Sequence, residues 1–434
     1  MNKDLKKSVV PALRFPEFRD EEMWETSLFG DIYVFKVTNS FTRDDLNYEH
    51  GEVKNIHYGD IHTKFSTSFY LEKEKVPFIN TSILLEKIKS ECYCMEGDMV
   101  FADASEDLND IGKCIEIISL NNEKVLSGLH TILARQISSK LIVGFGGYLF
   151  QSNGIRIQIQ KESQGTKVLG ISVGRLSNIV ICYPQDKVEQ KKIADCLSSV
   201  DDLINAQSEK IETLKKHKKG LMQQLFPAEG ETLPQLRFPE FQDSEEWEEK
   251  ILSEIGEVLM CKRIFAEETK NEGEVPFFKI GTLGGNPDAY ISKELFDKYK
   301  LRYNFPRKGE ILITCSGTVG KCQIYDGLDA YYQDSNIVWI DNPTLELSNE
   351  LIYYMLSNVN WKKLNSTTIV RIYGSDLRNL PFIFPKNLHE QQKIAECLTT
   401  LDDLIAAENE KLTILKAHKK GLMQQLFPNT NEIE

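Results

Sequence analysis

Three short stretches of this 434-residue chain contain residue types found in catalytic motifs, and each lacks a residue that the chemistry requires. Asp341–Thr344 reads DNPT, without the second proline and the aromatic ring that adenine methyltransferases stack on an extruded base. Ser316–Cys322 reads SGTVGKC, without the earlier glycine and the Ser or Thr after the lysine that a phosphate-binding loop needs. Val143–Gly147 reads VGFGG, which is too short and isolated for a nucleotide fingerprint. We therefore predict no catalytic residue in this chain.

The histidines and cysteines show no metal-ligand spacing. The seven histidines form no HExxH pattern, and among the nine cysteines only Cys92 and Cys94 stand close together. No apolar run approaches the roughly 18 residues that a membrane span needs, and the start lacks the apolar core of a secretory signal. We expect a cytoplasmic protein with reduced thiols, no bound metal or cofactor and no membrane partner.

The formal charge of -13 argues against a nucleic-acid binder, because affinity for phosphates usually needs a basic surface. Charge acts locally, however, and the cations cluster within 298–308 and again within 362–378. Taken alone, each cluster is more often an ordinary solvated face. Composition alone therefore leaves the question of DNA binding open.

Two segments occur twice in the chain. Residues 184–227 match 385–428 without a gap, and both copies end in HKKGLMQQLFP. Upstream, PALRFPEFRDEEMWE at 11–25 matches PQLRFPEFQDSEEWE at 234–248. The blocks between these repeats differ in length and look largely unrelated. We infer a pseudo-twofold chain made by duplication, in which the framework was kept and the blocks drifted.

Each long repeat predicts one helix, because its apolar residues follow one another at steps of four and three, the 3.5-residue period of a coiled-coil seam. Polar residues fill two seam positions in each copy: Gln207 and Lys218, then Glu408 and Lys419. The apolar seam positions are Ile193, Leu197, Val200, Ile204, Ile211, Leu214, Leu221 and Leu225 in the first copy, and Ile394, Leu398, Leu401, Ile405, Leu412, Leu415, Leu422 and Leu426 in the second.

The ends of these helices also have sequence signals. A proline ends each copy, and a glycine, Gly220 or Gly421, predicts a break before the last turn. The predicted N-terminal capping boxes are Asp186 with Glu189 and Asn387 with Glu390.

We predict that the two helices pair antiparallel. Parallel pairing would set Lys218 against Lys419, whereas one antiparallel register sets Glu408 opposite Lys218 and Gln207 opposite Lys419. The same register pairs apolar residues: Ile211 with Leu415, Ile204 with Leu422, and Val200 with Leu426. Taken alone, such helices could serve only as an oligomerisation coil.

The duplicated LRFPEF segment, the two variable blocks and the two helices ending in KKGLMQQLFP resemble the specificity subunit of type I restriction-modification enzymes. The resemblance covers essentially the whole chain, and its most specific parts are QKKIADCLSSVDDLI at 190–204 and QQKIAECLTTLDDLI at 391–405. It implies that each variable block is a target-recognition domain, that the helices form a spacer, and that the N-terminal segment docks near the end of the second helix.

The predicted fold class is α+β, with two α/β target-recognition domains, an antiparallel two-helix coiled coil and a pseudo-twofold internal repeat. The predicted boundaries are an N-terminal conserved segment at 1–25, target-recognition domain 1 at 26–184, spacer helix 1 at 185–227, a linker with the repeated LRFPEF segment at 228–248, target-recognition domain 2 at 249–385, spacer helix 2 at 386–428 and a tail at 429–434.

Each block has a turn-rich segment after a strand-like run, within 96–117 and within 308–325, and closes with a related stretch at 165–184 or 366–385. Hydroxyl residues beside cations suit phosphate contact, while Arg, Asn and Gln suit base edges. The turns could also serve only to connect strands. The predicted DNA contacts are Lys113, Thr166, Lys167, Arg175, Lys321, Thr367, Thr368, Arg371 and Tyr373.

The resemblance implies a non-catalytic subunit that binds a split, asymmetric sequence in double-stranded DNA. It further implies two methylation subunits and restriction subunits as partners, with S-adenosylmethionine, ATP and Mg²⁺ carried by those partners. The alternative is a structural coiled-coil adaptor that does not read DNA.

Overall fold

The computed structural model describes residues 10–361 and 371–428. The chain divides into two compact units: unit 1 is Met1–Ser208 with Glu410–Glu434, and unit 2 is Glu209–Asn409. Each of the two long helices is therefore shared, because its two halves belong to different units. No helix among the described residues is long and apolar enough to cross a membrane.

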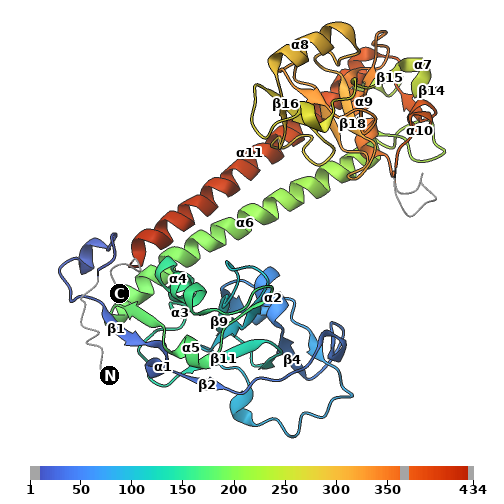
Figure 1. The fold of residues 1–434 in the computed structure, drawn as a ribbon. Coiled ribbons are helices and arrows are strands. Elements are labelled where there is room, and N and C mark those ends of the chain that lie inside the picture. The colour runs from blue at the N-terminus through green and yellow to red at the C-terminus, as the bar shows by residue number, and fades with distance from the viewer. Residues whose placement is uncertain (1–9, 362–370, 429–434) are drawn as a thin grey trace. The chain divides into compact units, whose positions relative to one another are not determined.

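Unit 1 is built on two main sheets (Figure 1). Its strands are β1 (Glu25–Leu28), β2 (Tyr33–Lys36), β3 (Leu46–Asn47), β4 (Val53–Ile56), β5 (Ser68–Tyr70), β6 (Phe78–Ile79), β7 (Met99–Ala102), β8 (Ala104–Ser105), β9 (Cys114–Ser119), β10 (Lys124–Ser127), β11 (Thr131–Gln136), β12 (Leu169–Gly170) and β13 (Val180–Tyr183). One sheet has the order β2-β11-β7-β9-β5 and the other β10-β4-β6-β3; β1 pairs with β13, and β8 with β12. Its helices are α1 (Phe29–Ile32), α2 (Tyr58–Thr63), α3 (Gly146–Gln151), α4 (Asn153–Glu162), α5 (Val173–Ser177) and the first half of α6 (Lys187–Leu225).

Unit 2 contains the strands β14 (Glu248–Ile251), β15 (Glu257–Leu259), β16 (Val275–Phe278), β17 (Tyr290–Ile291), β18 (Ile311–Thr314), β19 (Cys322–Ile324), β20 (Tyr331–Tyr332), β21 (Ile337–Asp341) and β22 (Pro381–Phe384). They form sheets of the order β15-β21-β18-β19 and β17-β16-β20, and β14 pairs with β22. Its helices are α7 (Leu252–Ile255), α8 (Lys293–Arg302), α9 (Asn349–Asn358), α10 (Gly374–Arg378) and the first half of α11 (Leu388–Leu426).

The two variable blocks fold on one plan although their sequences look unrelated. The order β15-β21-β18-β19 repeats β2-β11-β7-β9, and the parallel pair β16 and β20 repeats β4 and β10. The central strands β7 and β18 are buried along their whole length. These matching sheets and helices confirm the predicted fold class and the internal repeat.

Glycines with a left-handed backbone delimit the central hairpin of each unit. Gly97 (φ 85°) and Gly309 (φ 91°) precede β7 and β18, and Gly112 (φ 63°) and Gly320 (φ 79°) precede β9 and β19. Because a side chain is strained at such angles, these positions favour glycine. The two turn-rich segments noted in the sequence therefore occupy corresponding places, each joining an antiparallel pair of strands.

The long helices α6 and α11 follow the predicted repeats. Their seam residues are buried or half-buried, and the positions between them are mostly exposed. The predicted break at Gly220 and Gly421 is wrong, since both helices continue to Leu225 and Leu426. Glycine costs about 1 kcal/mol relative to alanine here. Burial of the apolar residues in the last turn offsets that cost, because Leu225 and Leu426 are each only 1% exposed.

A buried ion pair joins each LRFPEF segment to the first turn of a long helix. In unit 1, Arg14 Nε and Nη2 donate to the two carboxylate oxygens of Glu189, both at 2.7 Å. Trp24 Nε1 donates to the same carboxylate at 3.2 Å. The same contacts recur in unit 2 among Arg237, Glu390 and Trp247. The repeated segment is therefore a clamp on the helix start.

The predicted capping boxes are only half correct. Asp186 Oδ1 accepts a hydrogen bond from the Val188 N–H, and Asn387 caps α11 in the same way. Glu189 and Glu390, expected to reach back to the cap, bind the arginines instead. Their side chains are 1% exposed, and a carboxylate at such depth needs a positive partner.

The end of each long helix docks against the LRFPEF segment of its own unit. In unit 1, the Leu13 N–H donates to the Gln425 carbonyl at 2.9 Å, and the rings of Trp24 and Phe427 lie 6.2 Å apart. In unit 2, the Leu236 N–H donates to the Gln224 carbonyl, also at 2.9 Å. The predicted docking of the N-terminal segment is confirmed. The two identical HKKGLMQQLFP ends thus meet equivalent surroundings in the two units.

Within each unit the two helices run antiparallel, as predicted, but the predicted register is wrong. Lys218 Nζ donates to the Asp402 carboxylate at 2.5 and 2.6 Å rather than to Glu408. Glu408 accepts a hydrogen bond from Lys210 Nζ at 2.7 Å. Lys419, predicted opposite Gln207, donates to Asp201 at 2.6 Å.

These contacts place the helices about one heptad away from the predicted register. Leu426 accordingly shares a buried cluster with Ile193, which lies one heptad before Val200, the residue predicted to face it. A shift of one heptad keeps every seam residue in the seam, so the apolar pattern alone does not distinguish the two registers.

Each seam lysine also contacts a tyrosine of its own unit. The Lys218 ammonium lies 5.1 Å from the ring centre of Tyr354 in α9, and the Tyr354 hydroxyl donates to Asp402 at 3.0 Å. Unit 1 has the same arrangement, with Lys419, Tyr148 in α3 and Asp201. These Lys-Asp-Tyr groups connect the long helices to α9 in unit 2 and to α3 in unit 1.

Replacing Arg14 with Met should destabilise the protein by about 3–5 kcal/mol, because it leaves the Glu189 carboxylate buried without its partner. Denaturant unfolding measures this change. The double variant Arg14→Met with Glu189→Leu should recover much of the loss. Arg19→Met, at an exposed position of the same segment, is the control. A loss below about 1 kcal/mol for Arg14→Met would show that the clamp is not important for stability.

A double-mutant cycle should distinguish the two helix registers. Lys218→Met and Asp402→Asn should show a coupling energy on the order of 1 kcal/mol, because their side chains are in contact. Lys218→Met and Glu408→Gln should be additive. The opposite outcome, coupling only with Glu408, would support the register predicted from the sequence.

Candidate nucleic-acid interface

Several loops of unit 1 meet at one end of its five-stranded sheet. Since β11 runs antiparallel to β2 and β7, and β9 antiparallel to β7, the ends of β2 and β7 lie beside the starts of β11 and β9. Residues 37–45, 103–113 and 128–130 are therefore neighbours. The 164–170 turn joins them through the pairing of β12 with β8. We call this region the loop end of unit 1.

Unit 2 has an equivalent loop end. Strand β21 is antiparallel to β15 and β18, and β19 is antiparallel to β18. Residues 260–268, 315–321 and 333–336 therefore meet at the corresponding end of the sheet. The loops of both units occupy the same places, while their side chains differ.

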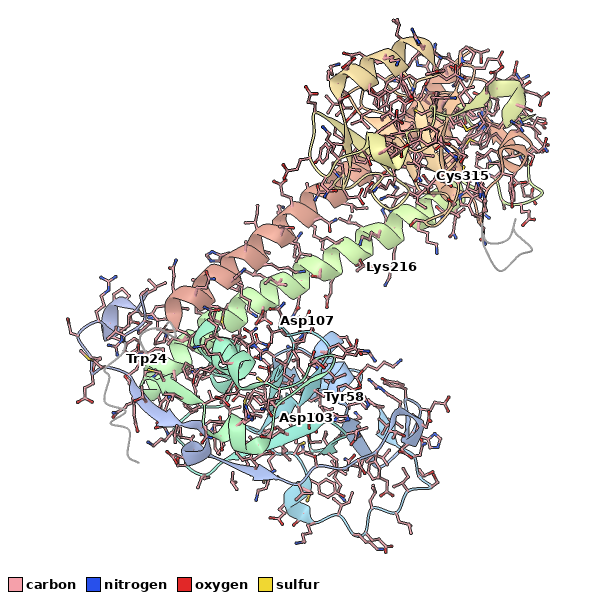
Figure 2. The ribbon with its side chains drawn as sticks, in the orientation of Figure 1. Trp24, Tyr58, Asp103, Asp107, Lys216 and Cys315 are labelled. Atoms are coloured by element: carbon pink, nitrogen blue, oxygen red, sulfur yellow. The ribbon has the colours of Figure 1, made fainter. Side chains whose placement is uncertain are left out.

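Three of the seven histidines surround Tyr58, which is labelled in Figure 2, at the loop end of unit 1. The ring centres of His57, His62 and His130 lie 4.6, 6.1 and 5.3 Å from that of Tyr58. They come from α2, the residue before it, and the turn before β11. Aromatic and imidazole rings at a loop end can stack on bases and form hydrogen bonds with them.

Asp103 holds His130 in place through both its main chain and its side chain. The Asp103 N–H donates to the His130 carbonyl at 3.0 Å, and His130 Nδ1 lies 3.1 Å from Asp103 Oδ1. His130 has a φ of 55°, which is uncommon for a residue with a side chain and is often found at functional sites. Its side chain is 51% exposed. With Nδ1 bound to Asp103, Nε2 is the ring atom that remains to bind a ligand.

A buried carboxylate organises the cations next to this cluster. Asp60 accepts hydrogen bonds from Arg43 at 2.7 and 2.8 Å and contacts Lys64 at 2.8 Å. Burial opposes ionisation of Asp60, but these bonds outweigh it and lower its pKa. Burial, together with the charge of Arg43, lowers the pKa of His57 to about 4. His57 is therefore neutral near pH 7, and its Nδ1 accepts a hydrogen bond from the Gly59 N–H.

The loop end of unit 2 has amide, hydroxyl and guanidinium groups at the turn that corresponds to that of His130. Arg263 Nε donates to Asp334 Oδ2 at 2.9 Å, and Ser316 Oγ donates to Asn336 Oδ1 at 2.7 Å. The Asn336 carbonyl accepts a hydrogen bond at 2.7 Å from the N–H of Cys315, which is labelled in Figure 2. Arginine, asparagine and serine side chains, such as those of Arg263, Asn336 and Ser316, read base edges in other proteins.

Comparison with known proteins assigns both units to one family. The family model described as the type I restriction modification DNA specificity domain matches residues 24–216 and 244–417. This chain belongs to that family. Each specificity domain, as we call the two matched regions, includes one variable block and most of one long helix.

Similar curated proteins are described as specificity subunits of type I restriction enzymes. A putative type I restriction enzyme specificity subunit of Haemophilus influenzae is 43% identical over 163 residues, which cover 38% of this chain and 42% of that relative. The putative MjaX specificity subunit of Methanocaldococcus jannaschii is 28% identical over 353 residues, or 76% of this chain and 77% of the relative. The MjaVIII specificity subunit of the same organism is 24% identical over 386 residues, or 81% and 85%.

Solved structures share the fold. The S subunit of a type I restriction-modification system from M. genitalium aligns with a TM-score of 0.58 and 15% identity, over 97% of this chain and 99% of that one. A chain from a type I R-M structure on complex assembly and conformational transition aligns with a TM-score of 0.58 and 17% identity, over 94% and 98%.

Two of the predicted DNA contacts are tied to main-chain carbonyls in the specificity domains. Lys113 Nζ donates to the His62 carbonyl at 2.6 Å and lies 3.8 Å from Asp110. Lys321 Nζ donates to the Leu283 carbonyl. Both lysines lie at the loop ends, so their contact with DNA remains a prediction, but each also has a structural role.

Thr166 and Lys167 are exposed in the turn beside β8, at the loop end of the first specificity domain. Arg175 in α5 donates to the Glu162 carbonyl at 3.0 Å and contacts its carboxylate at 3.4 Å. The structure therefore places Thr166 and Lys167 at the same loop end as Lys113, and it gives Arg175 a partner within the domain. DNA contact by these residues remains a prediction.

In the second specificity domain, Thr367 and Thr368 lie outside the described residues. The Arg371 guanidinium lies 5.7 Å from the ring centre of Tyr373, whose side chain is 59% exposed. The Ile372 N–H between them donates to the Cys315 carbonyl at 2.8 Å. Arg371 and Tyr373 thus lie next to the loop end, where their predicted contact with DNA is sterically feasible.

Sequence reasoning missed the histidine cluster around Tyr58. His57 and His62 are five residues apart, and His130 is remote in sequence, so their spacing fits no known ligand pattern. Asn336, Ser316 and Arg263 were also missed. A comparison of the corresponding glycine-bounded turns of the two blocks could have pointed to these loop ends. Loop residues that differ between two copies of one framework are candidates for determining binding specificity.

Protonation of His57 should make stability depend on pH. Its pKa is about 4 in the folded chain, below the 6.5 of an unfolded histidine, so its contribution is complete above pH 6.5 and is lost as the pH falls toward 4. From pH 7.5 to pH 5 the wild type should lose about 2 kcal/mol more than His57→Asn, which keeps an acceptor for Gly59. Thermal melts at both pH values measure this difference. His50→Asn, an exposed control, should behave like the wild type.

Proposed function

We propose that this chain is the DNA-recognition subunit of a type I restriction-modification enzyme and that it binds a split, asymmetric sequence in double-stranded DNA. The observation that supports this most is the pairing of constant and variable features. The two units share sheets, clamps and helix contacts, but the turns at corresponding places in their loop ends present different side chains: His130 with Asp103 and Tyr58 in unit 1, and Asn336 with Ser316 beside Arg263 and Asp334 in unit 2. A single repeated site would carry the same groups twice.

The chain would act as a scaffold rather than as an enzyme. In this proposal two methylation subunits bind it, and restriction subunits can join them. S-adenosylmethionine, ATP and Mg²⁺ would be bound by those partners and not by this chain. The proposal agrees with the absence of the second proline and the aromatic residue at Asp341–Thr344, which a methyltransferase would need to hold an extruded base.

The acidic composition fits such a division of labour. With a net charge of -13, the chain is poorly suited to hold a duplex by phosphate contacts alone. The partner subunits would supply much of the positive surface, and the loop ends would read the bases. The alternative of a coiled-coil adaptor that does not read DNA has no support in the family assignment.

Co-expression with its methylation subunit, followed by sequencing of methylated adenines in the host genome, tests this proposal. We expect one asymmetric motif in two parts, separated by a gap of fixed length. Methylation or salt-sensitive binding without any sequence preference would support the adaptor instead.

A further inference from the structure

The two units contain a pocket at the same place in their loop ends. In unit 1 a pocket of about 670 Å³ is lined by residues of the loop after β2 and of the turn before β11, with Asp103. In unit 2 a pocket of about 340 Å³ is lined by residues of the loop after β15 and of the turn before β21. Side chains differ between the pockets, although the elements correspond.

Main-chain contacts establish that the two turns are equivalent. The first residue after β7, Asp103, donates its N–H to His130, and the first residue after β18, Cys315, donates to Asn336. The Asp103 carbonyl accepts from the Ile171 N–H, as the Cys315 carbonyl does from that of Ile372. His130 and Asn336 are the last residues before β11 and β21, so they occupy corresponding positions.

Both turns contain a strained residue. His130 has a φ of 55° in unit 1, and Ser335, next to Asn336, has a φ of 54° in unit 2. A residue with a side chain adopts this conformation at a cost of order 1–3 kcal/mol. The strained backbone occurs in both units, whereas the side chains of the turn differ. This combination is typical of a turn whose backbone shape is needed to expose its side chains to a ligand.

In the unit 1 pocket, hydrogen bonding defines what His130 can bind. With Asp103 accepting from Nδ1–H, the neutral ring offers Nε2 as an acceptor. An acceptor in the major groove matches the exocyclic amino group of adenine or cytosine. The exposed lysines at the rim, Lys87 and Lys89, are suited to phosphates.

In the unit 2 pocket the geometry favours a different base. Arg263 donates its Nε–H to Asp334, and this hydrogen bond fixes the guanidinium plane. It uses only one of the five N–H donors of the guanidinium group. Its side chain is 60% exposed, so it can form the bidentate contact that arginine makes with guanine O6 and N7. Among the described residues, Gln333 Oε1 in the same lining is buried without a hydrogen-bond partner. It is a further acceptor that a ligand could satisfy.

We propose that these two pockets are the base-reading sites of the chain: His130, positioned by Asp103, recognises an amino-bearing base in one half of the DNA target, and Arg263, positioned by Asp334, recognises a guanine in the other half. This inference rests on the proposed function and names the residues that determine specificity.

Genome-wide mapping of methylated adenines, with each variant co-expressed with the methylation subunit, tests the proposal. His130→Ala should reduce discrimination at one position in one half of the motif by about tenfold or more, and leave the other half unchanged. Arg263→Ala should do the same at a guanine in the other half. His50→Ala and Arg302→Ala, at exposed positions outside both pocket linings, should keep the wild-type motif.

Three other outcomes would overturn the inference, and they can be told apart. An unchanged motif for both pocket variants would exclude these side chains from base reading while leaving the proposed function intact. An equal loss of methylation at all sequences, by variants that melt and assemble like the wild type, would mean phosphate contact only. A wild-type chain that gives no split motif at all would contradict the proposed function itself.

Discussion

The buried arginine-carboxylate pair at the start of each long helix is the contact on which the rest of each unit depends. The pair joins the LRFPEF segment to the start of the long helix, through Arg14 and Glu189 in unit 1 and through Arg237 and Glu390 in unit 2. A tryptophan that binds the same carboxylate, Trp24 or Trp247, packs in the hydrophobic core of its unit. Such a pair stabilises little compared with apolar residues of similar size, but it tolerates few alternative partners. It therefore explains why this part of the sequence was preserved in both copies while the blocks between diverged.

The sequence predicted the repeated long helices, but it did not determine their register or the contacts of residues remote in sequence. Seam spacing predicted both long helices, because burial of one helix face imposes a 3.5-residue period, and the lysines at the polar seam positions predicted the antiparallel direction. It predicted the wrong register, because a shift of one heptad satisfies the same pattern and only the reach of Lys218 to Asp402 and Tyr354 selects between the two. Glu189 was read as a capping residue because its arginine partner is remote in sequence.

The candidate site was predicted less well, for a related reason. The sequence indicated that Lys113 and Lys321 lie in turns after strands, since each follows a glycine with a left-handed backbone, and such a position favours glycine; their contact with DNA stays a prediction. The Tyr58 cluster leaves no such trace, because sheet pairing brings its histidines together from separate elements. The two blocks thus reach the same topology by burying different apolar residues in the same central strands, which frees their loop ends to differ.

The division of the chain has a consequence for its synthesis on the ribosome. Unit 2 is one continuous stretch, Glu209–Asn409, whereas unit 1 needs Glu410–Glu434 to be complete. Trp24 and Phe145 pack against Phe427, so part of the first core has no cover until Phe427 has been made, after the whole of unit 2. The half that is translated first is therefore the half that finishes folding last, and in the nascent chain its apolar surface is exposed to chaperones and to aggregation.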